Sequence, residues 1–345
     1  MNRPIHIVMT PTRNEAWVIR AFLECNGLWA DYIIIADQMS TDGSRDIINA
    51  YREKWKEEGR ACKIIMIENN REDIHMAAVR SMLMEEARKI PGDKILVALD
   101  ADEFWADDFM QTDGWKKMIN SKPDDVFEFK RMNLFPDLKH YCIEPEKEYY
   151  NWATHVSDDF WEGTYPTDRF IHEWRLKWSK QSTDNKVYQL DDLKLLHLCF
   201  VSKRREENKK RFYMVSSVAV PNNVYNMINL YRLYNHLQNE QNIHETKNDV
   251  FEQYQKCGID ISGLIDTTDE GAYYIERILY YIQRDGAKKY AILDIWNQNL
   301  CEKYGLRDPR NIWQKAVHFY LRKTNNIAST NKIIKAIDKV LKKVC

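Results

Sequence analysis

The sequence predicts an α/β fold with a mainly parallel sheet, followed by a helical C-terminal region. Four short runs rich in β-branched residues lie in the first hundred residues, and each has the length and composition of a buried strand. Longer amphipathic segments separate these runs. Strand–helix alternation of this kind forms right-handed βαβ units, with helices on both faces of a parallel sheet. The four expected strands are Ile5–Met9, Ile33–Ala36, Ile64–Ile67 and Ile95–Leu99.

Three helices are expected between these strands, because apolar residues recur there at intervals of three and four. Asp42 and Gly43 supply turn and cap residues before the second helix, and Pro91 and Gly92 end the third. The expected helices are Glu15–Cys25, Ser44–Glu58 and Asp73–Lys89.

The pattern changes beyond about residue 125. Val126–Met132 and Leu193–Phe200 have strand character, whereas Tyr141–Thr183 is rich in Trp, Tyr, Asp and Glu and has little periodicity, as in long loops over a site. We therefore expect two parts, a sheet-containing domain at residues 1–203 and a mainly helical region at residues 204–345. The expected C-terminal helices are Glu206–Ser217, Tyr225–Leu237, Val250–Lys256, Tyr273–Arg284, Lys288–Lys303, Asn311–Arg322 and Lys332–Lys343.

Composition argues against several classes of protein. The 345 residues include 51 Lys and Arg against 52 Asp and Glu, whereas a dedicated nucleic-acid binder normally has a clear basic excess, so no nucleic-acid partner is expected. The longest apolar runs are far shorter than the ~18 residues of a membrane-spanning helix. The N-terminus has no apolar signal core, and the seven cysteines are never spaced as CxxC. These features predict a cytoplasmic chain with reduced thiols.

The last expected helix, Lys332–Lys343, is amphipathic, with five lysines around an apolar side. Such a helix packs on its neighbours or lies on an anionic membrane surface. Packing is favoured, because the apolar side carries no Trp or Phe to anchor it in a bilayer.

Polar residues follow the first two strands, at the edge where open parallel sheets bind ligands. The segment after the first strand contains no glycine, so the GxGxxG dinucleotide fingerprint is absent. Thr12 and Asn14 offer hydroxyl and amide groups for a ribose or a base, or else cap the next helix. Asp37 directly ends the second strand, where an acid is well placed to accept hydrogen bonds from ribose hydroxyls or a base N–H.

The segment after the fourth strand is crowded with acids. Asp100 and Asp102 are two residues apart, so in an extended chain their carboxylates face the same way. Such crowding is unfavourable unless a cation neutralises it. Carboxylate oxygens suit Mg²⁺ or Mn²⁺, and the phosphates of a bound nucleotide would complete the coordination shell.

Three motifs in register resemble glycosyltransferase family 2, which is built on the GT-A nucleotide-sugar fold. They are Pro11–Glu15, Asp37–Ser44 and Asp100–Glu103, and the resemblance extends loosely to about residue 200. It implies an enzyme that transfers a sugar, with inversion, from a nucleotide-diphosphate sugar to a hydroxyl of a glycan or lipid-linked acceptor. It assigns contacts with the base and ribose to Thr12, Asn14, Glu15 and Asp37, and a contact with the nucleotide to Arg80.

The resemblance also implies a metal site and a general base. Asp102, with Asp100 assisting, would hold Mn²⁺ or Mg²⁺ on the diphosphate, and His197 on a late strand would join the shell. The base is expected among the acids before His197, with Asp159 favoured and Asp158 and Glu173 as alternatives. At family level, the setting would be polysaccharide assembly in the cytoplasm, with peripheral contact at the inner face of the membrane.

Two other functions stay open. One is a non-catalytic protein that binds nucleotide sugars or carbohydrates on a degenerate GT-A domain. The other is a phosphohydrolase with Asp100 as nucleophile and Asp102 as acid/base. Such hydrolases usually carry their Asp-x-Asp after the first strand, whereas here it follows the fourth.

Overall fold

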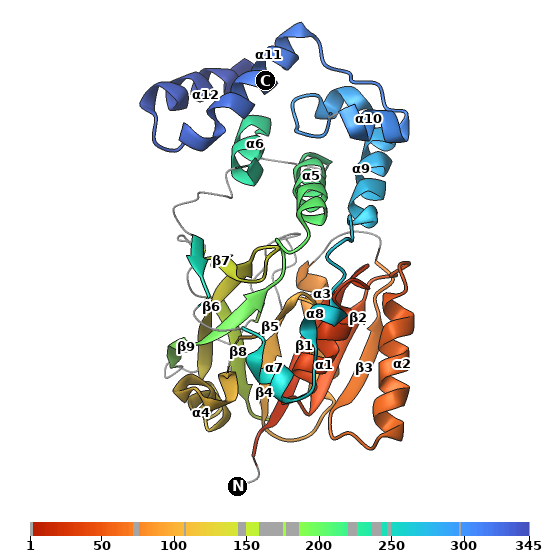
Figure 1. Cartoon of the computed structure of the whole chain (residues 1–345), viewed down its shortest axis with the longest axis vertical. Helices are drawn as coiled ribbons and strands as arrows, with labels where there is room; N and C mark the ends of the chain where they lie inside the picture. The colour runs from red at the N-terminus through yellow and green to blue at the C-terminus, as the bar shows by residue number, and fades with distance from the viewer. Residues whose placement is uncertain are drawn as a thin grey trace. The chain divides into compact units, whose positions relative to one another are not determined.

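The computed structural model divides the chain into two compact units (Figure 1). Unit 1 comprises Met1–Val201 and His244–Thr267, and unit 2 comprises Ser202–Ile243 and Thr268–Cys345. The sequence predicted a single boundary at residue 203, whereas in the structure the later segment His244–Thr267 returns to unit 1. The structure describes residues 3–71, 76–106, 108–143, 150–158, 175–176, 186–219, 226–235, 243–246, 250–296 and 298–344.

The first four strands of unit 1 are parallel and stand in the order β3-β2-β1-β4. The β-branched side chains of β2 and β4 are buried on both faces, as expected of a covered parallel sheet, whereas the edge strand β3 is only partly buried. The alternating α/β architecture expected from the sequence is confirmed. These strands are β1 (Ile5–Thr12), β2 (Tyr32–Asp37), β3 (Lys63–Glu68) and β4 (Lys94–Ala98).

The sheet continues beyond β4 with antiparallel and mixed pairing. β8 runs antiparallel to β4, β6 pairs antiparallel with β8, and β9 pairs parallel with β6 and antiparallel with β5. Short strands β7 and β10 form the edge beside β6. The bounds are β5 (Glu103–Trp105), β6 (Val126–Leu134), β7 (His140–Cys142), β8 (Tyr150–Val156), β9 (Val187–His197) and β10 (Ile243–Glu245).

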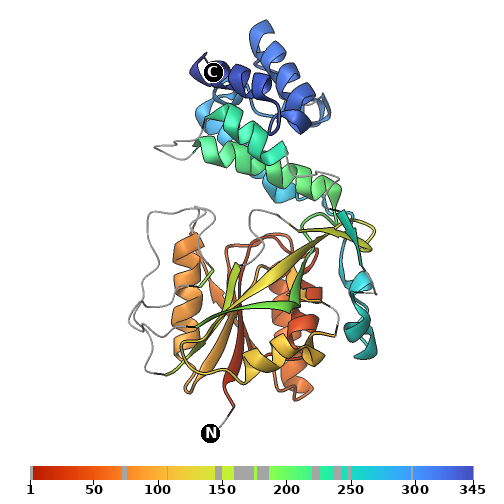
Figure 2. The same cartoon turned by 90° about the vertical axis from the view of Figure 1, so that its left-hand side faces the viewer.

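Helices cover both faces of this sheet, with α1 and α2 on one side and α3 on the other (Figure 2). Alternate residues of β1 separate into two apolar cores, since Val8 packs on the α1 and α2 side and Ile7 on the α3 side. The helices are α1 (Ile19–Asn26), α2 (Ser44–Glu57), α3 (Met76–Arg88), η1 (Phe109–Gln111) and α4 (Asp113–Ile119).

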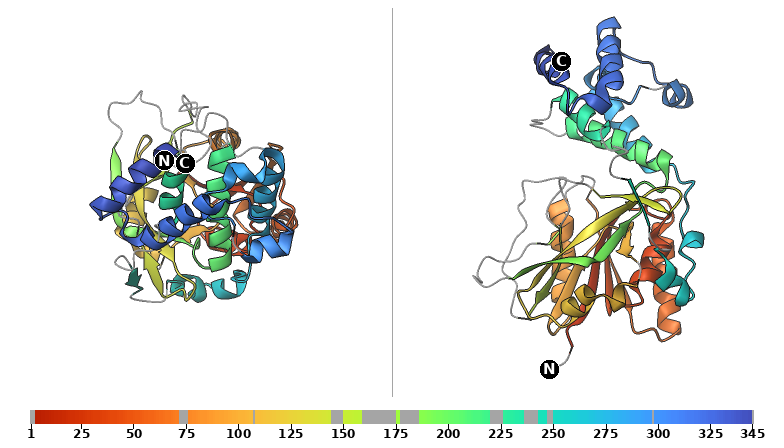
Figure 3. Two further views of the ribbon diagram at one scale, coloured as in Figure 1. Left: turned by 90° about the horizontal axis from the view of Figure 1, so that it is seen from above. Right: turned by 60° about the vertical axis from the view of Figure 1, so that its left-hand side comes forward.

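The returning segment carries α7 (Glu252–Lys256) and α8 (Ile261–Leu264), which lie beside α1 (Figure 3). Its apolar residues belong to the same core as α1 and α2. The Tyr254 hydroxyl donates a hydrogen bond of 2.7 Å to the carbonyl of Trp105, next to the acidic turn after β4. The segment therefore completes unit 1.

Unit 2 is helical, and α6, α11 and α12 share one small apolar core. None of the helices in the described ranges is long and apolar enough to cross a membrane. The elements of unit 2 are α5 (Lys203–Ala219), α6 (Met227–Asn235), α9 (Ala272–Asp285), η3 (Ala287–Tyr290), α10 (Gln298–Tyr304), α11 (Ile312–Thr324), η4 (Asn325–Ile327) and α12 (Lys332–Val344).

Candidate functional site

Buried polar groups gather where β1, β2 and β3 end. Thr12 and Asp37 are direct partners in the β1–β2 register, and Asn69 follows β3. Three of their side-chain atoms are buried and have no hydrogen-bond partner in the structure: Thr12 Oγ1, Asp37 Oδ1 and Asn69 Nδ2. Because a buried polar group without a partner is costly, this arrangement points to a polar ligand at the carboxyl ends of the strands.

Asp37 is buried and has polar neighbours. Its Oδ2 accepts a hydrogen bond of 3.2 Å from the Ser40 backbone N–H and lies 3.4 Å from Arg45 Nε. Burial nevertheless raises the pKa of the Asp37 carboxyl above its ordinary value, although Ser40 and Arg45 act in the opposite direction.

Asn14 and Glu15 connect the loop after β1 to the loop after β2. Asn14 has a positive φ of 56°, its N–H donates to Ser40 Oγ at 2.8 Å, and its Oδ1 accepts from the Thr41 N–H at 2.7 Å. The Glu15 N–H donates to Ser44 Oγ, and its carboxylate accepts from Trp17 Nε1. The two residues thus lie at the expected edge, where their hydrogen bonds hold the two loops together.

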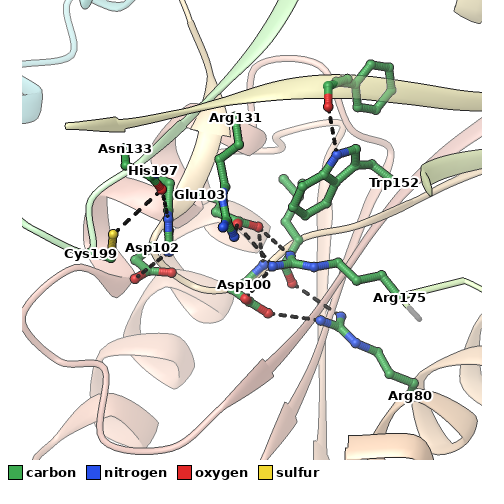
Figure 4. A network of polar contacts seen from close by, with 12 residues as sticks. Arg80, Asp100, Asp102, Glu103, Arg131, Asn133, Trp152, Arg175, His197 and Cys199 are labelled. Atoms are coloured by element: carbon green, nitrogen blue, oxygen red, sulfur yellow. Dashed lines mark hydrogen bonds and ion pairs between the residues drawn. The ribbon is translucent and has the colours of Figure 1, made fainter. Parts of the chain in front are cut away.

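The acidic segment after β4 differs from the expected geometry. β4 ends at Ala98, and a backbone hydrogen bond of 3.0 Å from Glu103 N–H to the Asp100 carbonyl closes a turn. In a turn the two-residue periodicity of a strand no longer applies. Asp100 and Asp102 therefore contact different partners, and the expectation that their carboxylates project together is wrong (Figure 4).

Asp100 lies between two arginines. Its Oδ1 is 2.9 Å from the Arg80 guanidinium and its Oδ2 is 2.5 Å from the Arg175 guanidinium. Arg175 also contacts both carboxylate oxygens of the fully buried Glu103, and Arg131 lies 3.6 Å from Glu103. Both oxygens of Asp100 are thus held by arginines in this arrangement. Arg80 lies beside the acidic turn.

Asp102 and His197 form a separate pair. His197 Nε2 lies 3.5 Å from Asp102 Oδ2, and its Nδ1 lies 2.6 Å from Asn133 Oδ1. An amide oxygen only accepts hydrogen bonds, so Nδ1 is the donor, and Nε2 is the ring nitrogen that faces the Asp102 carboxylate. A histidine fixed through its other nitrogen beside a carboxylate is the arrangement found at metal sites.

The number of protein ligands is small. Within the described ranges, no group of three or more His, Cys, Asp or Glu side chains comes together in a way that could hold a metal ion by itself. Asp102 and His197 nevertheless suit a cation such as Mg²⁺ or Mn²⁺, which commonly takes one or two protein ligands and completes its shell with phosphate oxygens and water.

Of the three candidates for the general base, Asp158 is within the described residues. Asp158 lies just after β8 and accepts hydrogen bonds of 2.8 Å from Lys94 Nζ and from the Gly92 N–H. Lys94 begins β4, so Asp158 lies at the amino end of the parallel strands, opposite the acidic turn. The Asp158 carboxylate is therefore held on Lys94, away from the acidic turn. Asp159 and Glu173 lie outside the described residues.

The comparisons with known proteins agree with this site at the level of the family. Residues 7–127 match the model described as Glycosyl transferase family 2. This part of the chain is a glycosyltransferase family 2 domain. Its sheet and covering helices accordingly form a GT-A fold, followed by the helical C-terminal region.

Likenesses to solved structures are weak. A mannosyltransferase from Pyrobaculum calidifontis in complex with GDP-Man and Mn²⁺ has 12% identity and a TM-score of 0.40, over 96% of this chain and 89% of that one. A nucleoside-diphosphate-sugar pyrophosphorylase from Vibrio cholerae has 12% identity and a TM-score of 0.27, over 44% of this chain and 72% of that one. A UDP-glucose pyrophosphorylase complexed with UDP-glucose has 9% identity and a TM-score of 0.27, over 56% of this chain and 90% of that one. No curated protein sequence matches the chain.

The structure adds residues to the candidate site that the sequence did not single out. Asn69 directly follows a strand that the sequence predicted. Like Asp37, it could have been found as a polar residue at the carboxyl end of a parallel strand. Asn133 is identified only by strand pairing, since β6 places it opposite His197. Arg175 lies in a segment without periodicity, where nothing in the local sequence distinguishes one arginine from another.

Proposed function

We propose that the protein is a metal-dependent, inverting glycosyltransferase of the hexosyltransferase type. It would move a sugar from a nucleotide-diphosphate sugar to a hydroxyl of a glycan or glycolipid. The observation that carries the proposal is the pair of Asp102 and His197, oriented by Asn133 at the carboxyl edge of the sheet. This pair supplies a metal site where the family's nucleotide-sugar donor would bind.

The unpartnered atoms at the ends of β1, β2 and β3 support donor binding. A hydroxyl, a carboxylate oxygen and an amide N–H together match the mixed donors and acceptors of a nucleoside. We propose that Thr12 and Asp37 contact the nucleoside and that Asn69 contributes a further hydrogen bond. Asn14 and Glu15 hold the loops that shape this part of the site.

The diphosphate would bind beside Asp102, His197 and the arginines. Asp102 and His197 would hold the Mn²⁺ or Mg²⁺, which supplies charge stabilisation for the departing nucleotide diphosphate. Arg80, Arg131 and Arg175 gather around Asp100 and Glu103, and their guanidinium groups would attract the anionic diphosphate. Asp100 thus acts by orienting Arg80 and Arg175.

A general base must accept the proton of the acceptor hydroxyl as the new glycosidic bond forms. We propose Asp159 for this role, with Glu173 as the alternative. Glu173→Gln and Asp159→Asn distinguish them: the base variant loses transfer and keeps donor binding, because removal of one carboxylate leaves the nucleotide contacts intact.

The deciding experiment measures release of nucleotide diphosphate from a panel of nucleotide sugars with Mn²⁺, with and without acceptor sugars. Release that depends on Mn²⁺ and falls at least about 100-fold in Asp102→Ala, as removal of charge stabilisation at a leaving group does, supports the transferase. Asp113→Asn is the matched control, because Asp113 is an exposed acid on α4. Phosphate release from phosphomonoesters would instead indicate the hydrolase, and donor binding without release would indicate the non-catalytic protein.

A further inference from the structure

The last helix of unit 2 leaves an apolar stripe in solvent. Ile333 and Val340 on α12 are 71% and 62% exposed, and Ile337 lies between them on the same side. The three residues are spaced by four and three positions, which places them along one face of a helix. An exposed aliphatic stripe of this kind marks an interaction surface.

A neighbouring face of the same helix is packed. Ile334 and Leu341 are buried, and Leu341 joins the core formed with Ile228 and Tyr231 of α6. Asp338, also buried, pairs with Arg232 of α6 at 3.0 Å. Helix α12 is therefore fixed to its neighbours and still presents a second apolar face. Packing on its neighbours is thus compatible with binding to a membrane surface.

The exposed charged residues around the apolar stripe of α12 are positive. Residues 311–344 contain eight Lys and Arg residues, and all eight are exposed. The acidic residue of this segment is Asp338, which is buried and paired with Arg232. The exposed charges of α11 and α12 are thus all positive, although the whole chain has a net charge of −1.

Helix α11 adds the aromatic residues that the α12 stripe lacks. Phe319 and Trp313 are 63% and 55% exposed, and Ile312 at the start of the helix is 89% exposed. Phe319 is four positions from both Lys315 and Lys323, so the three exposed side chains lie along one face of α11. Aromatic and aliphatic side chains mixed with lysines are typical of helices that bind at a bilayer interface.

We propose that α11 and α12 form a docking surface for an anionic lipid bilayer. The α12 stripe and the exposed α11 residues would enter the boundary between headgroups and acyl chains. The lysines would extend to anionic headgroups, with their aliphatic stems along the apolar surface. A second copy of the chain fits less well, because pairing two such surfaces would bring two sets of lysines together.

The test is sedimentation of the full chain with vesicles of phosphatidylcholine alone or with about one-third phosphatidylglycerol. We expect binding to the anionic vesicles, at least about tenfold stronger than to neutral ones and weakened by salt. Changing the stripe (Ile333→Ser with Val340→Ser) and changing the charge (Lys332, Lys339 and Lys343→Gln) should each weaken binding by about tenfold or more. Because the changed side chains are exposed, thermal unfolding should be nearly unchanged.

Matched controls separate this surface from general charge and hydrophobicity. Val187→Ser with Leu233→Ser removes two exposed apolar side chains elsewhere, and Lys54, Lys56 and Lys63→Gln removes three exposed lysines of unit 1. Both controls should bind as the natural chain does. Equal binding to neutral vesicles, no binding to either, or equal losses in the controls would overturn the proposal. So would a lipid-free dimer that the stripe variant converts to a monomer. None of these readouts depends on the proposed transferase activity.

Discussion

The guanidinium group of Arg175 lies over the indole ring of Trp152, 4.0 Å from its centre. Trp152 is itself fully buried, and its Nε1 donates a hydrogen bond of 3.1 Å to the Phe129 carbonyl. The ring therefore forms a fixed platform, which holds the arginine in place while its nitrogens contact Asp100 and Glu103. Trp152, a buried residue of β8, thus sets the position of the Arg175 guanidinium group in the site.

We expect Arg175→Ala to destabilise the protein by roughly 2–3 kcal/mol, because it removes the main partner of a fully buried carboxylate. Adding Glu103→Gln should restore part of this loss, since the side chain then carries no charge. Urea unfolding of the single and double variants measures both effects. Equal stability of Arg175→Ala and the double variant would show that the charge of Glu103 is not the cause.

Asn133→Ala should weaken Mn²⁺ binding by about 10- to 100-fold, because His197 loses the acceptor that fixes its ring. Titration of free Mn²⁺ by electron paramagnetic resonance, in the presence of a nucleoside diphosphate, measures this affinity without turnover. Asn133→Gln moves the acceptor by one methylene and should have an intermediate effect. Unchanged affinity in Asn133→Ala would exclude Asn133 from positioning the metal ligand.

Asp158→Asn should keep kcat/KM within about twofold of the natural chain, because Asp158 lies at the opposite edge of the sheet from the acidic turn. Its contact with Lys94 Nζ lowers the pKa of the Asp158 carboxyl below its ordinary value. The pair therefore stabilises the fold above about pH 4, and this contribution is lost as the pH falls through the lowered pKa. A large loss of turnover in Asp158→Asn, at unchanged thermal stability, would contradict this placement.

Asp37→Asn should raise the thermal stability at pH 7 and weaken donor binding. Burial raises the Asp37 pKa in the folded state, so its ionised form destabilises the fold at neutral pH, and this cost disappears below the unfolded pKa of about 3.9. We expect an increase in Tm of roughly 2–4 °C at pH 7, the shift that about 1 kcal/mol produces in a domain of this size, and a smaller increase near pH 4. A difference in Tm that does not vary with pH would show that ionisation is not the cause.

The sequence was sufficient to predict the parts of the fold that follow local periodicity. The apolar runs at residues 33–36 and 95–98 lie in buried strands, and Asp37 ends its strand as expected. It could not reveal the turn that separates Asp100 from Asp102, because an extended segment and a tight turn differ there by one backbone hydrogen bond.

Long-range pairing explains the other differences. Asp158 had the right residue type, but its distance from the acidic turn follows from β8 running antiparallel to β4. The role of Asn133 depends on its place opposite His197 in the parallel pairing of β6 with β9. Neither relationship leaves a local pattern in the chain, since both join residues more than 60 positions apart.

The returning segment of unit 1 has a consequence for biosynthesis. Tyr254 bonds to the Trp105 carbonyl and packs edge-on against Phe104, in the strand that follows the acidic turn. A ribosome reaches this tyrosine only after it has made residues 202–243, which fold into the other unit. Unit 1 is therefore complete, and its Phe104 ring covered on this side, only when about residue 267 has emerged, so the two units mature together instead of in succession.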